Sequence, residues 1–424
     1  MKRLSIALAA TLVLGGDLLA QAVPEGAQAT KVPMAYRRTP QLRVDPFRHV
    51  MIPHWGLVIS GGGLAGNNTV TIADARAMWY LIDNDAELVG DALDLLSNVP
   101  DGDGFRLDAE AEGGVYLGGP FGRHFSLGIS AKARSYGIGN IDDAAVSLLR
   151  DGNVARQNFD LGNSKGVALG TEEFGAHGVI RLGPIASEDG VVLTLGGGAR
   201  LVKPVFYYAA TTTLDSRLYV ASDSVAAAVT IDALASIDVD FTDISLGSDL
   251  VADFMVRLEW PTSGIAFEAM FANFGSVTVE NLELQSKTFE VNSTYITEVL
   301  DSLETDFAVT DTVSVTVKLP RIIRFAASAW ANRFLQIDVS ARLKTTGTVF
   351  EYPFEGELGT TWRLIRQLPL RVGLIVGGAQ DIGFSGGLGL ETRNLFFSVA
   401  GRSIGGFLTE GTGVAGRLEL GFFF

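Results

Sequence analysis

The chain closes on nine residues in which apolar and polar side chains alternate: Gly416-Arg417-Leu418-Glu419-Leu420-Gly421-Phe422-Phe423-Phe424. Successive side chains of a β-strand point to opposite faces, so Leu418, Leu420, Phe422 and Phe424 share one apolar face. A final strand of this kind, ending on an aromatic, is typical of a transmembrane β-barrel, whose apolar face meets lipid. We therefore expect the whole chain to be such a barrel. Those four residues would form the signal that the barrel-assembly machinery recognises.

The same alternation recurs along the rest of the chain. Segments of about ten residues have one apolar face and one small, polar or charged face, and turn residues separate them; examples are residues 125–134, 250–260, 335–344, 368–376 and 395–402. A secreted β-sandwich gives the same pattern over a few strands. Repetition over the whole chain favours one closed antiparallel sheet, because closure removes the edges that an open sheet exposes. The pattern predicts an all-β, up-and-down barrel over residues 54–424, with about 12 to 16 strands.

Composition supports a structure that is polar inside and apolar outside. The chain is 47% hydrophobic with 50 glycines, and its mean hydropathy is +0.27. No run of apolar residues is long enough for a helix that spans a membrane. Cysteine is absent, so there is neither a disulfide framework nor a thiolate site.

The first 22 residues have the pattern of a signal peptide. Met1-Lys2-Arg3 is basic, residues 4–14 are apolar, and Ala20-Gln21-Ala22 is a small-residue cleavage site. The alternative, a membrane anchor, is disfavoured because the apolar run is too short to span about 30 Å of hydrocarbon. We expect cleavage after Ala22, export through the general secretory pathway, and localisation in the outer membrane of a Gram-negative cell. The mature chain is acidic, with no basic stripe, which argues against a nucleic-acid partner.

Residues 23–53 show little periodicity and are expected to form a periplasmic lead-in, with the first strand at residues 55–60. Three later segments predict short helices: residues 84–98, 141–150 and 293–305. The first has a capping pair, Asn84-Asp85, before an apolar stripe of period 3.6. This helix would either cover a mouth of the barrel or form part of a plug in the lumen, and the sequence leaves both open.

Aromatic residues recur near the ends of the expected strands: Tyr207, Tyr208, Trp260, Trp330 and Trp362. Tyr and Trp are enriched where a membrane meets water, so these residues are candidates for interface girdles. Ordinary aromatic residues within strands are the alternative.

Several motifs resemble functional sites but lack the necessary context. Residues 61–66 match the dinucleotide pattern G-x-G-x-x-G, yet a strand-like run follows instead of a helix, so we expect a glycine-rich turn. Ser164 and Ser385 both lie in G-x-S-x-G sequences without the helix that a nucleophile elbow requires. Residues 101–104 lack most ligands of a calcium loop.

The four histidines, His49, His54, His124 and His177, show no spacing typical of metal ligands. The sequence thus assigns no catalytic, cofactor-binding or metal-binding residue, and it predicts a protein that is not an enzyme and carries no cofactor.

A set of short motifs, in this order, carries a resemblance to a known family: Asn67-Asn68-Thr69, the helix at 84–98, Gly152-Asn153, Glu173-Phe174-Gly175, residues 195–203, Asp253, Asn273-Phe274-Gly275 and Leu319-Pro320. The chain resembles an uncharacterised family of bacterial outer-membrane barrels, a domain of unknown function, distantly related to the FadL-type long-chain fatty-acid transporters. The resemblance implies fourteen strands, an N-terminal hatch and the passage of hydrophobic compounds. Asn67-Asn68-Thr69 stands where the FadL-type Asn-Pro-Ala motif would be.

Three functions are compatible with these observations. The first is a passive channel for small hydrophobic compounds across the outer membrane, with lipid and a hydrophobic small molecule as partners. The second is a structural or secretion-accessory barrel whose outer loops bind other proteins, which the acidic stretch 281–312 motivates because loops on rigid scaffolds carry function. The third is a soluble secreted β-protein.

Overall fold

The structure, a computed structural model, describes residues 47–51, 54–69, 71, 73, 99, 104–122, 124–151, 157–185, 190–213, 215–220, 225–236, 249–293, 309–332, 334–343, 345, 354–378, 382–406 and 411–424. All of them belong to one compact unit, Arg38–Phe424. Ala20 and Ala22, the helix expected at 84–98 and residues 294–305 lie outside the described residues.

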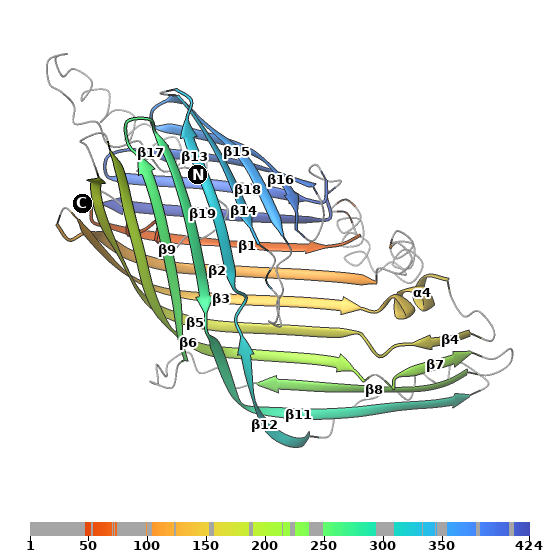
Figure 1. The fold of residues 1–424 in the computed structure, drawn as a ribbon. Helices are drawn as coiled ribbons and strands as arrows, with labels where there is room; N and C mark the ends of the chain where they lie inside the picture. Colours follow the sequence, from red (N-terminus) through yellow and green to blue (C-terminus); the bar gives the residue numbers. More distant parts are fainter. Residues whose placement is uncertain are drawn as a thin grey trace, which may run out of the picture. The chain divides into compact units, whose positions relative to one another are not determined.

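Fourteen strands pair in antiparallel order into a closed ring, which confirms the predicted barrel and its strand number (Figure 1). Closure comes from β1 and β19, which pair from Gly56 with Phe423 to Gly66 with Gly413. The ring strands are β1 Gly56–Asn67, β2 Phe105–Pro120, β3 Phe125–Ile141, β5 Lys165–Ile185, β6 Val191–Thr212, β9 Asp249–Trp260, β10 Ile265–Phe274, β13 Ile322–Trp330, β14 Leu335–Arg342, β15 Glu355–Ile365, β16 Leu368–Gly377, β17 Ile382–Glu391, β18 Leu395–Ile404 and β19 Gly413–Phe423.

The alternation read from the sequence sorts side chains between the two faces of the ring. Apolar residues point outward, such as Ile129, which is 60% exposed, and Phe254, which is 52% exposed. Their neighbours on the same strands, such as Lys132 and Asp253, point inward and are buried. On β19 the same rule places Leu418 and Phe422 outside and Arg417 and Glu419 inside. The barrel is therefore apolar outside and polar inside.

The two ends of the ring differ in the length of their connections. One end, which we call the short-turn end, has the connections 121–124, 186–190, 261–264, 331–334, 366–367 and 392–394. The first and last strands of the barrel meet at this end, since the Phe424 N–H donates to the Trp55 carbonyl at 2.9 Å. The opposite, long-loop end has the connections 68–104, 142–164, 213–248 and 275–321, among others. This asymmetry is typical of transmembrane barrels.

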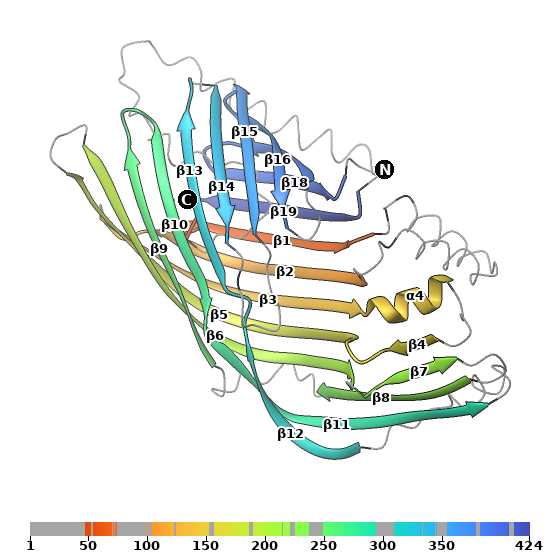
Figure 2. The same ribbon diagram turned by 45° about the vertical axis from the view of Figure 1, so that its right-hand side comes forward.

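Five further strands extend from the long-loop end and were not predicted: β4 Gln157–Asp160, β7 Arg217–Val220, β8 Val225–Ser236, β11 Ser276–Ser293 and β12 Val309–Lys318 (Figure 2). We call them the extension sheet. β8 pairs with the outer part of β6, β11 pairs with β8, and β12 pairs with β11. Much of the acidic stretch 281–312, interpreted above as loop, is therefore strand.

Helix α4, Asp143–Asp151, lies at the long-loop end, where the sequence predicts the second short helix. Asp142 precedes it and its carboxylate accepts from the Ala144 N–H at 2.9 Å, so it caps the first turn. Among the described residues, no helix is both long and apolar enough to cross a membrane.

The glycine-rich residues 61–66 lie within β1 and not in a turn, so that expectation was wrong. Glycine is needed there for close strand packing: a Cβ at Gly62 would lie 2.6 Å from the Gly416 carbonyl oxygen of β19. The first strand consequently runs well beyond the expected residue 60. Ser385 also lies inside a strand, β17, and a strand follows Ser164, so neither sits on a nucleophile elbow.

Candidate functional site in the barrel lumen

A network of buried charges crosses the lumen, and Arg200 of β6 is its centre. The Nε and Nη2 atoms of Arg200 donate to the two carboxylate oxygens of Asp253 at 2.7 and 2.9 Å. Its Nη2 also donates to the side-chain oxygen of Asn273 at 2.6 Å, and its Nη1 pairs with Glu173. Arg200, Asp253 and Glu173 are each no more than 1% exposed. This bidentate contact with Asp253 fixes the plane of the Arg200 guanidinium.

The network continues onto β2 and β3. Lys132 Nζ lies 3.1 Å from Glu173 Oε2, and Arg134 pairs with Glu112. The Tyr116 hydroxyl donates to Glu112 at 3.1 Å. Glu112 and Glu173 each lie within 4.0 Å of Lys132 and Arg134, so each is shared by more than one positive group. Buried ion pairs of this kind add little stability over apolar packing, but losing one partner is costly because the other charge stays buried.

Asn273 joins the network to the point where the chain leaves the ring for the extension sheet. Its backbone has φ of 63°, a conformation that Asn tolerates better than most residues. The Asn273 N–H donates to Asp253 at 2.9 Å, and its side-chain amide donates to the Pro320 carbonyl at 2.6 Å. Pro320 lies between β12 and β13, where the chain returns to the ring. The Asn273 side chain therefore links the point where the chain leaves the ring to the point where it returns.

The residues that meet here come from the motifs that carried the family resemblance: Glu173, Arg200, Asp253, Asn273 and Pro320. Sequence reasoning quoted those motifs but did not predict that they converge. The sequence did contain a signal for this site, because several strands carry a charged or amide residue at a position that the alternation turns inward. Their meeting point depends on the strand register, which the sequence pattern does not fix.

His177 of β5 also belongs to the network, which the sequence analysis missed. Its Nε2 lies 3.0 Å from an oxygen of Asp253. Within the described ranges, no three His, Asp or Glu side chains are placed as ligands of a metal ion. His177 thus extends the buried hydrogen-bond network around Asp253 and Arg200.

Residues 47–51, the last part of the expected lead-in, form a turn inside the lumen that we call the N-terminal turn. Phe47 is fully buried against inward-facing Val179, Met255 and Met270, and its ring meets His177 edge-on with centroids 5.5 Å apart. Gly196 makes room, since a Cβ there would lie 2.8 Å from the Phe47 ring. The turn therefore occupies lumen beside the charge network.

The N-terminal turn also contacts the strands that close the ring. His49 stacks on Tyr116 of β2 with ring centroids 4.3 Å apart. Arg48 lies 3.7 Å from Glu419 of β19 and over the Phe396 ring of β18. The turn thus bridges β2, β18 and β19 from the inside, next to the β1–β19 seam.

Ion pairs also line the lumen on β9, β10 and β13 to β16. Glu268 lies between Arg257 and Arg324, at 3.1 and 2.7 Å. Arg371 pairs with Asp338 at 2.5 Å and with Glu357 at 2.8 Å. Glu268 is thus a carboxylate held between two arginines, whereas Arg371 is a buried arginine held between two carboxylates.

On the long-loop side of the charge network, the lumen is filled by apolar residues, which we call the luminal apolar cluster. It joins the inner faces of β3, β5, β6 and β9 to β11 and β12; its buried members are Tyr136, Leu169, Val202, Tyr207, Val251, Val277, Val279, Leu282, Val317 and Leu319. Through β11 and β12, this cluster packs the extension sheet against the barrel.

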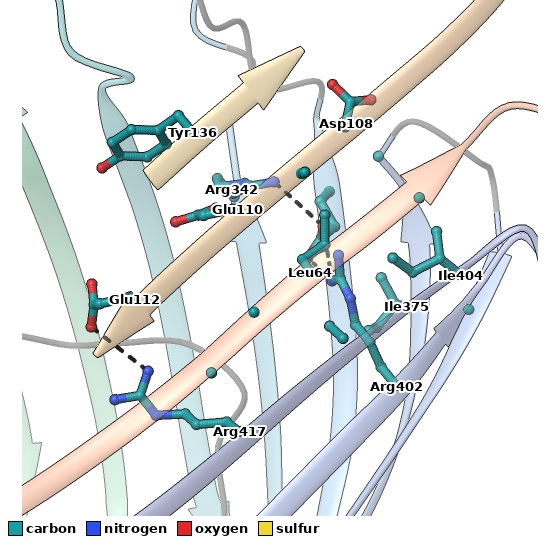
Figure 3. A pocket seen from close by; sticks show the side chains of 18 of the residues that line it. Leu64, Asp108, Glu110, Glu112, Tyr136, Arg342, Ile375, Arg402, Ile404 and Arg417 are labelled. Atoms are coloured by element: carbon teal, nitrogen blue, oxygen red, sulfur yellow. Dashed lines mark hydrogen bonds and ion pairs between the residues drawn. The ribbon is translucent and has the colours of Figure 1, made fainter. Parts of the chain in front are cut away.

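A cavity of about 180 Å³ remains in the lumen (Figure 3). Apolar side chains such as Leu64, Ile375 and Ile404 line it together with arginines such as Arg342, Arg402 and Arg417. Figure 3 shows Arg417 directed toward Glu112. The wall of the cavity thus offers both an apolar and a charged surface.

The aromatic residues proposed for interface girdles fall into two groups. Trp260, Trp330 and Trp362 lie at or near the short-turn ends of β9, β13 and β15. Tyr208 points outward and is 48% exposed, but Tyr207 is 5% exposed within the luminal apolar cluster. Tyr207 therefore does not belong to an outer girdle, because the alternation of the strand turns it inward.

The chain aligns along most of its length with several solved structures. The Ralstonia pickettii toluene transporter TbuX aligns over 88% of this chain and 90% of its own, with 9% identity and a TM-score of 0.46. The P. putida toluene transporter TodX aligns over 90% and 93%, with 8% identity and a TM-score of 0.44. A Pseudomonas aeruginosa FadL homologue aligns over 90% and 93%, with 11% identity and a TM-score of 0.45. No family model and no curated protein matches the chain.

A FadL homologue is among the structures that align with this chain. TbuX and TodX are described as toluene transporters, and CymD, which also aligns, as a monoaromatic hydrocarbon channel. At this level of identity the similarity concerns the fold.

Proposed function

We propose that the protein is an outer-membrane β-barrel that lets small, largely apolar molecules pass through its lumen. The observation that carries the proposal is the distribution of polarity. The outer face of the ring is apolar on strand after strand, while charged residues line the inside. An antiparallel barrel of this polarity is stable in a lipid bilayer, where closure satisfies every strand edge.

The asymmetry of the two ends suggests an orientation. In bacterial barrels short turns face the periplasm and long loops face outward. The short-turn end, with Trp55 and Phe424, would then face the periplasm, and the extension sheet would face outward. The tryptophans at the short-turn end would lie at the periplasmic interface. A signal peptide cleaved after Ala22 and insertion by the barrel-assembly machinery complete this proposal.

The contents of the lumen favour a gated passage over an open pore. The N-terminal turn, the charge network and the luminal apolar cluster fill much of the cross-section, and the cavity lies among them. A molecule with apolar surface would find contacts in that cavity that a purely charged lumen would not offer. For a solute to pass, the N-terminal turn, the charge network or the luminal apolar cluster must therefore move.

Two measurements test the proposal. Membrane fractionation should recover the protein in the outer membrane, in a form whose mobility in gels changes on heating. Cells that make the protein should take up a small apolar compound such as toluene faster than otherwise identical cells that lack it. Recovery in the aqueous periplasm without detergent, or equal uptake by the two kinds of cell, would contradict it.

A further inference from the structure

Two neighbouring connections at the short-turn end each present an exposed arginine: Arg366 between β15 and β16, and Arg393 between β17 and β18. The connections lie side by side, since the Glu391 N–H donates to the Gln367 carbonyl at 2.7 Å. Arg363 strengthens this link, because its Nη1 donates to the Glu391 carboxylate at 2.7 Å and to the Arg366 carbonyl at 3.2 Å. Residues 363–367 and 391–394 therefore form one continuous edge, which we call the basic rim.

The charges of the basic rim leave a net positive surface. Arg363 and Glu391 pair with each other, so their charges compensate. Arg366 and Arg393 remain. Among the described residues, neither of these side chains forms an ion pair with a carboxylate, that of the neighbouring Phe424 included. The two exposed guanidinium groups can therefore bind an anion from outside the protein.

The positive rim contrasts with the charge of the rest of the chain. The formal net charge is −15, and acidic residues outnumber basic ones in the long connections 68–104 and 213–248. Among the short-turn connections, the acidic residues belong to 186–190, which joins β5 to β6, half the ring away in strand order. An anionic partner is thus attracted to the basic rim by local charge, against the net charge of the chain.

Exposed apolar side chains lie directly beside Arg366. Trp362 and Leu364 share the outward face of β15, since Arg363 between them is buried, and Leu364 is 74% exposed. The Arg363 N–H donates to the Phe334 carbonyl at 2.7 Å, which places a further exposed aromatic residue at the same edge. A lipid surface accommodates both kinds of side chain, because the apolar ones enter the hydrocarbon while the guanidinium groups stay level with the phosphates.

We propose that the basic rim binds the headgroups of anionic phospholipids, such as phosphatidylglycerol, in the leaflet at the short-turn end. Arg366 and Arg393 each offer paired N–H donors to a lipid phosphate. Trp362 and Leu364 lie among the first carbons of the acyl chains. The inference rests on the proposed function in treating the barrel as a membrane protein, and it assigns a lipid partner to the β15–β18 side of the ring.

The first test uses the unaltered protein in phosphatidylcholine vesicles that contain a minor fraction of a brominated lipid, which quenches tryptophan fluorescence on contact. Brominated phosphatidylglycerol is compared with brominated phosphatidylcholine at the same fraction. Trp362 lies beside Arg366, so phosphatidylglycerol should quench more, with an apparent affinity about fivefold higher for each arginine that it engages. Added salt should reduce this preference. Equal quenching by the two lipids would overturn the proposal.

The second test places the site on the rim. The double variant Arg366→Gln, Arg393→Gln should lose the preference for phosphatidylglycerol, and each single variant should lose about fivefold of it. Arg217→Gln is the matched control, because Arg217 is also exposed but lies on β7 of the extension sheet. If the double variant does not reach the heat-modifiable form, the single variants take its place. A full preference in the folded variants would overturn the assignment.

A soluble phosphate is the alternative occupant of the basic rim. Glycerol 1-phosphate carries the phosphate group of the headgroup without acyl chains, so it lacks the contacts that Trp362 and Leu364 make. At constant ionic strength, it should leave the preference for phosphatidylglycerol unchanged. If low concentrations of glycerol 1-phosphate removed the preference, the occupant would be a soluble phosphate and the lipid assignment would be wrong.

Uptake by cells separates this inference from the proposed function. If cells that make the protein take up toluene faster but the purified barrel does not prefer phosphatidylglycerol, the lipid site is wrong and the channel stands. If the barrel prefers phosphatidylglycerol, with the expected dependence on Arg366 and Arg393, but the two kinds of cell take up toluene equally, the lipid site stands and the channel is wrong.

Discussion

Asp253 shows how much of the lumen can depend on one side chain. Its carboxylate accepts hydrogen bonds from Arg200 and from the Asn273 N–H, and His177 lies within hydrogen-bond distance. Asp253→Asn would leave Arg200 buried with fewer partners, and we expect it to lower the free energy of unfolding by about 3 kcal/mol. Urea unfolding in lipid vesicles measures this. Phe254→Leu, on the outer face next to it, should cost less than about 1.5 kcal/mol; equal losses in both variants would show that the network is not the cause.

Leu64 and Ala65 are neighbours on β1 whose side chains point to opposite faces of the barrel wall. Leu64 lines the cavity, whereas Ala65 points outward. Leu64→Trp should fill the cavity and reduce the rate at which cells that make the protein take up toluene about tenfold, because a ring then occupies the space that a solute needs. Ala65→Trp should leave uptake unchanged, since lipid accommodates the ring. A similar rate in both variants would place the route elsewhere.

At the scale of elements, the N-terminal turn is the part of the lumen best placed to move. It is a short segment whose apolar anchor is Phe47, while Arg48 and His49 make the contacts with β2, β18 and β19 described above. Phe47→Ala removes that anchor, at a cost of about 3 kcal/mol to its docking, and should raise the open probability of single channels in planar bilayers. Ile59→Ala on the outer face of β1 is the control. An unchanged open probability would mean that the turn does not obstruct the route.

The elements also show what the sequence could predict. Strands such as β9 and β16 could be predicted because the alternation of lipid-facing and lumen-facing residues is visible within each strand's own sequence. The extension sheet was missed because its strands lie beyond the ring, and the acidic residues of β11 resembled a loop. The lumen was missed for another reason: Arg200, Asp253 and Asn273 are far apart in the sequence, and only the register of β6, β9 and β10 brings them together.

For the whole molecule, the last strand connects assembly with the finished barrel. β19 pairs with both β1 and β18, so its outer face carries the proposed recognition signal while its inner face supplies Arg417 to the cavity and Glu419 to the contact with Arg48. Substitutions on the two faces should therefore have different effects. Changes on the inner face should alter binding or flux in an assembled barrel, whereas changes on the outer face should alter how much barrel is assembled.

Phe424 gives the sharpest test of that separation. It is 74% exposed and lies at the short-turn end, where a charge on the outer surface costs about 0–1 kcal/mol of stability. If the terminal aromatic is recognised during assembly, Phe424→Asp should reduce the heat-modifiable protein in the outer membrane severalfold, while the barrel that does assemble unfolds at nearly the same urea concentration. Val414→Ala, on the same outer face at the other end of β19, should leave the yield unchanged. A normal yield of Phe424→Asp would refute the assembly signal, and a fall in yield matched by an equally large loss of stability would assign the effect to packing.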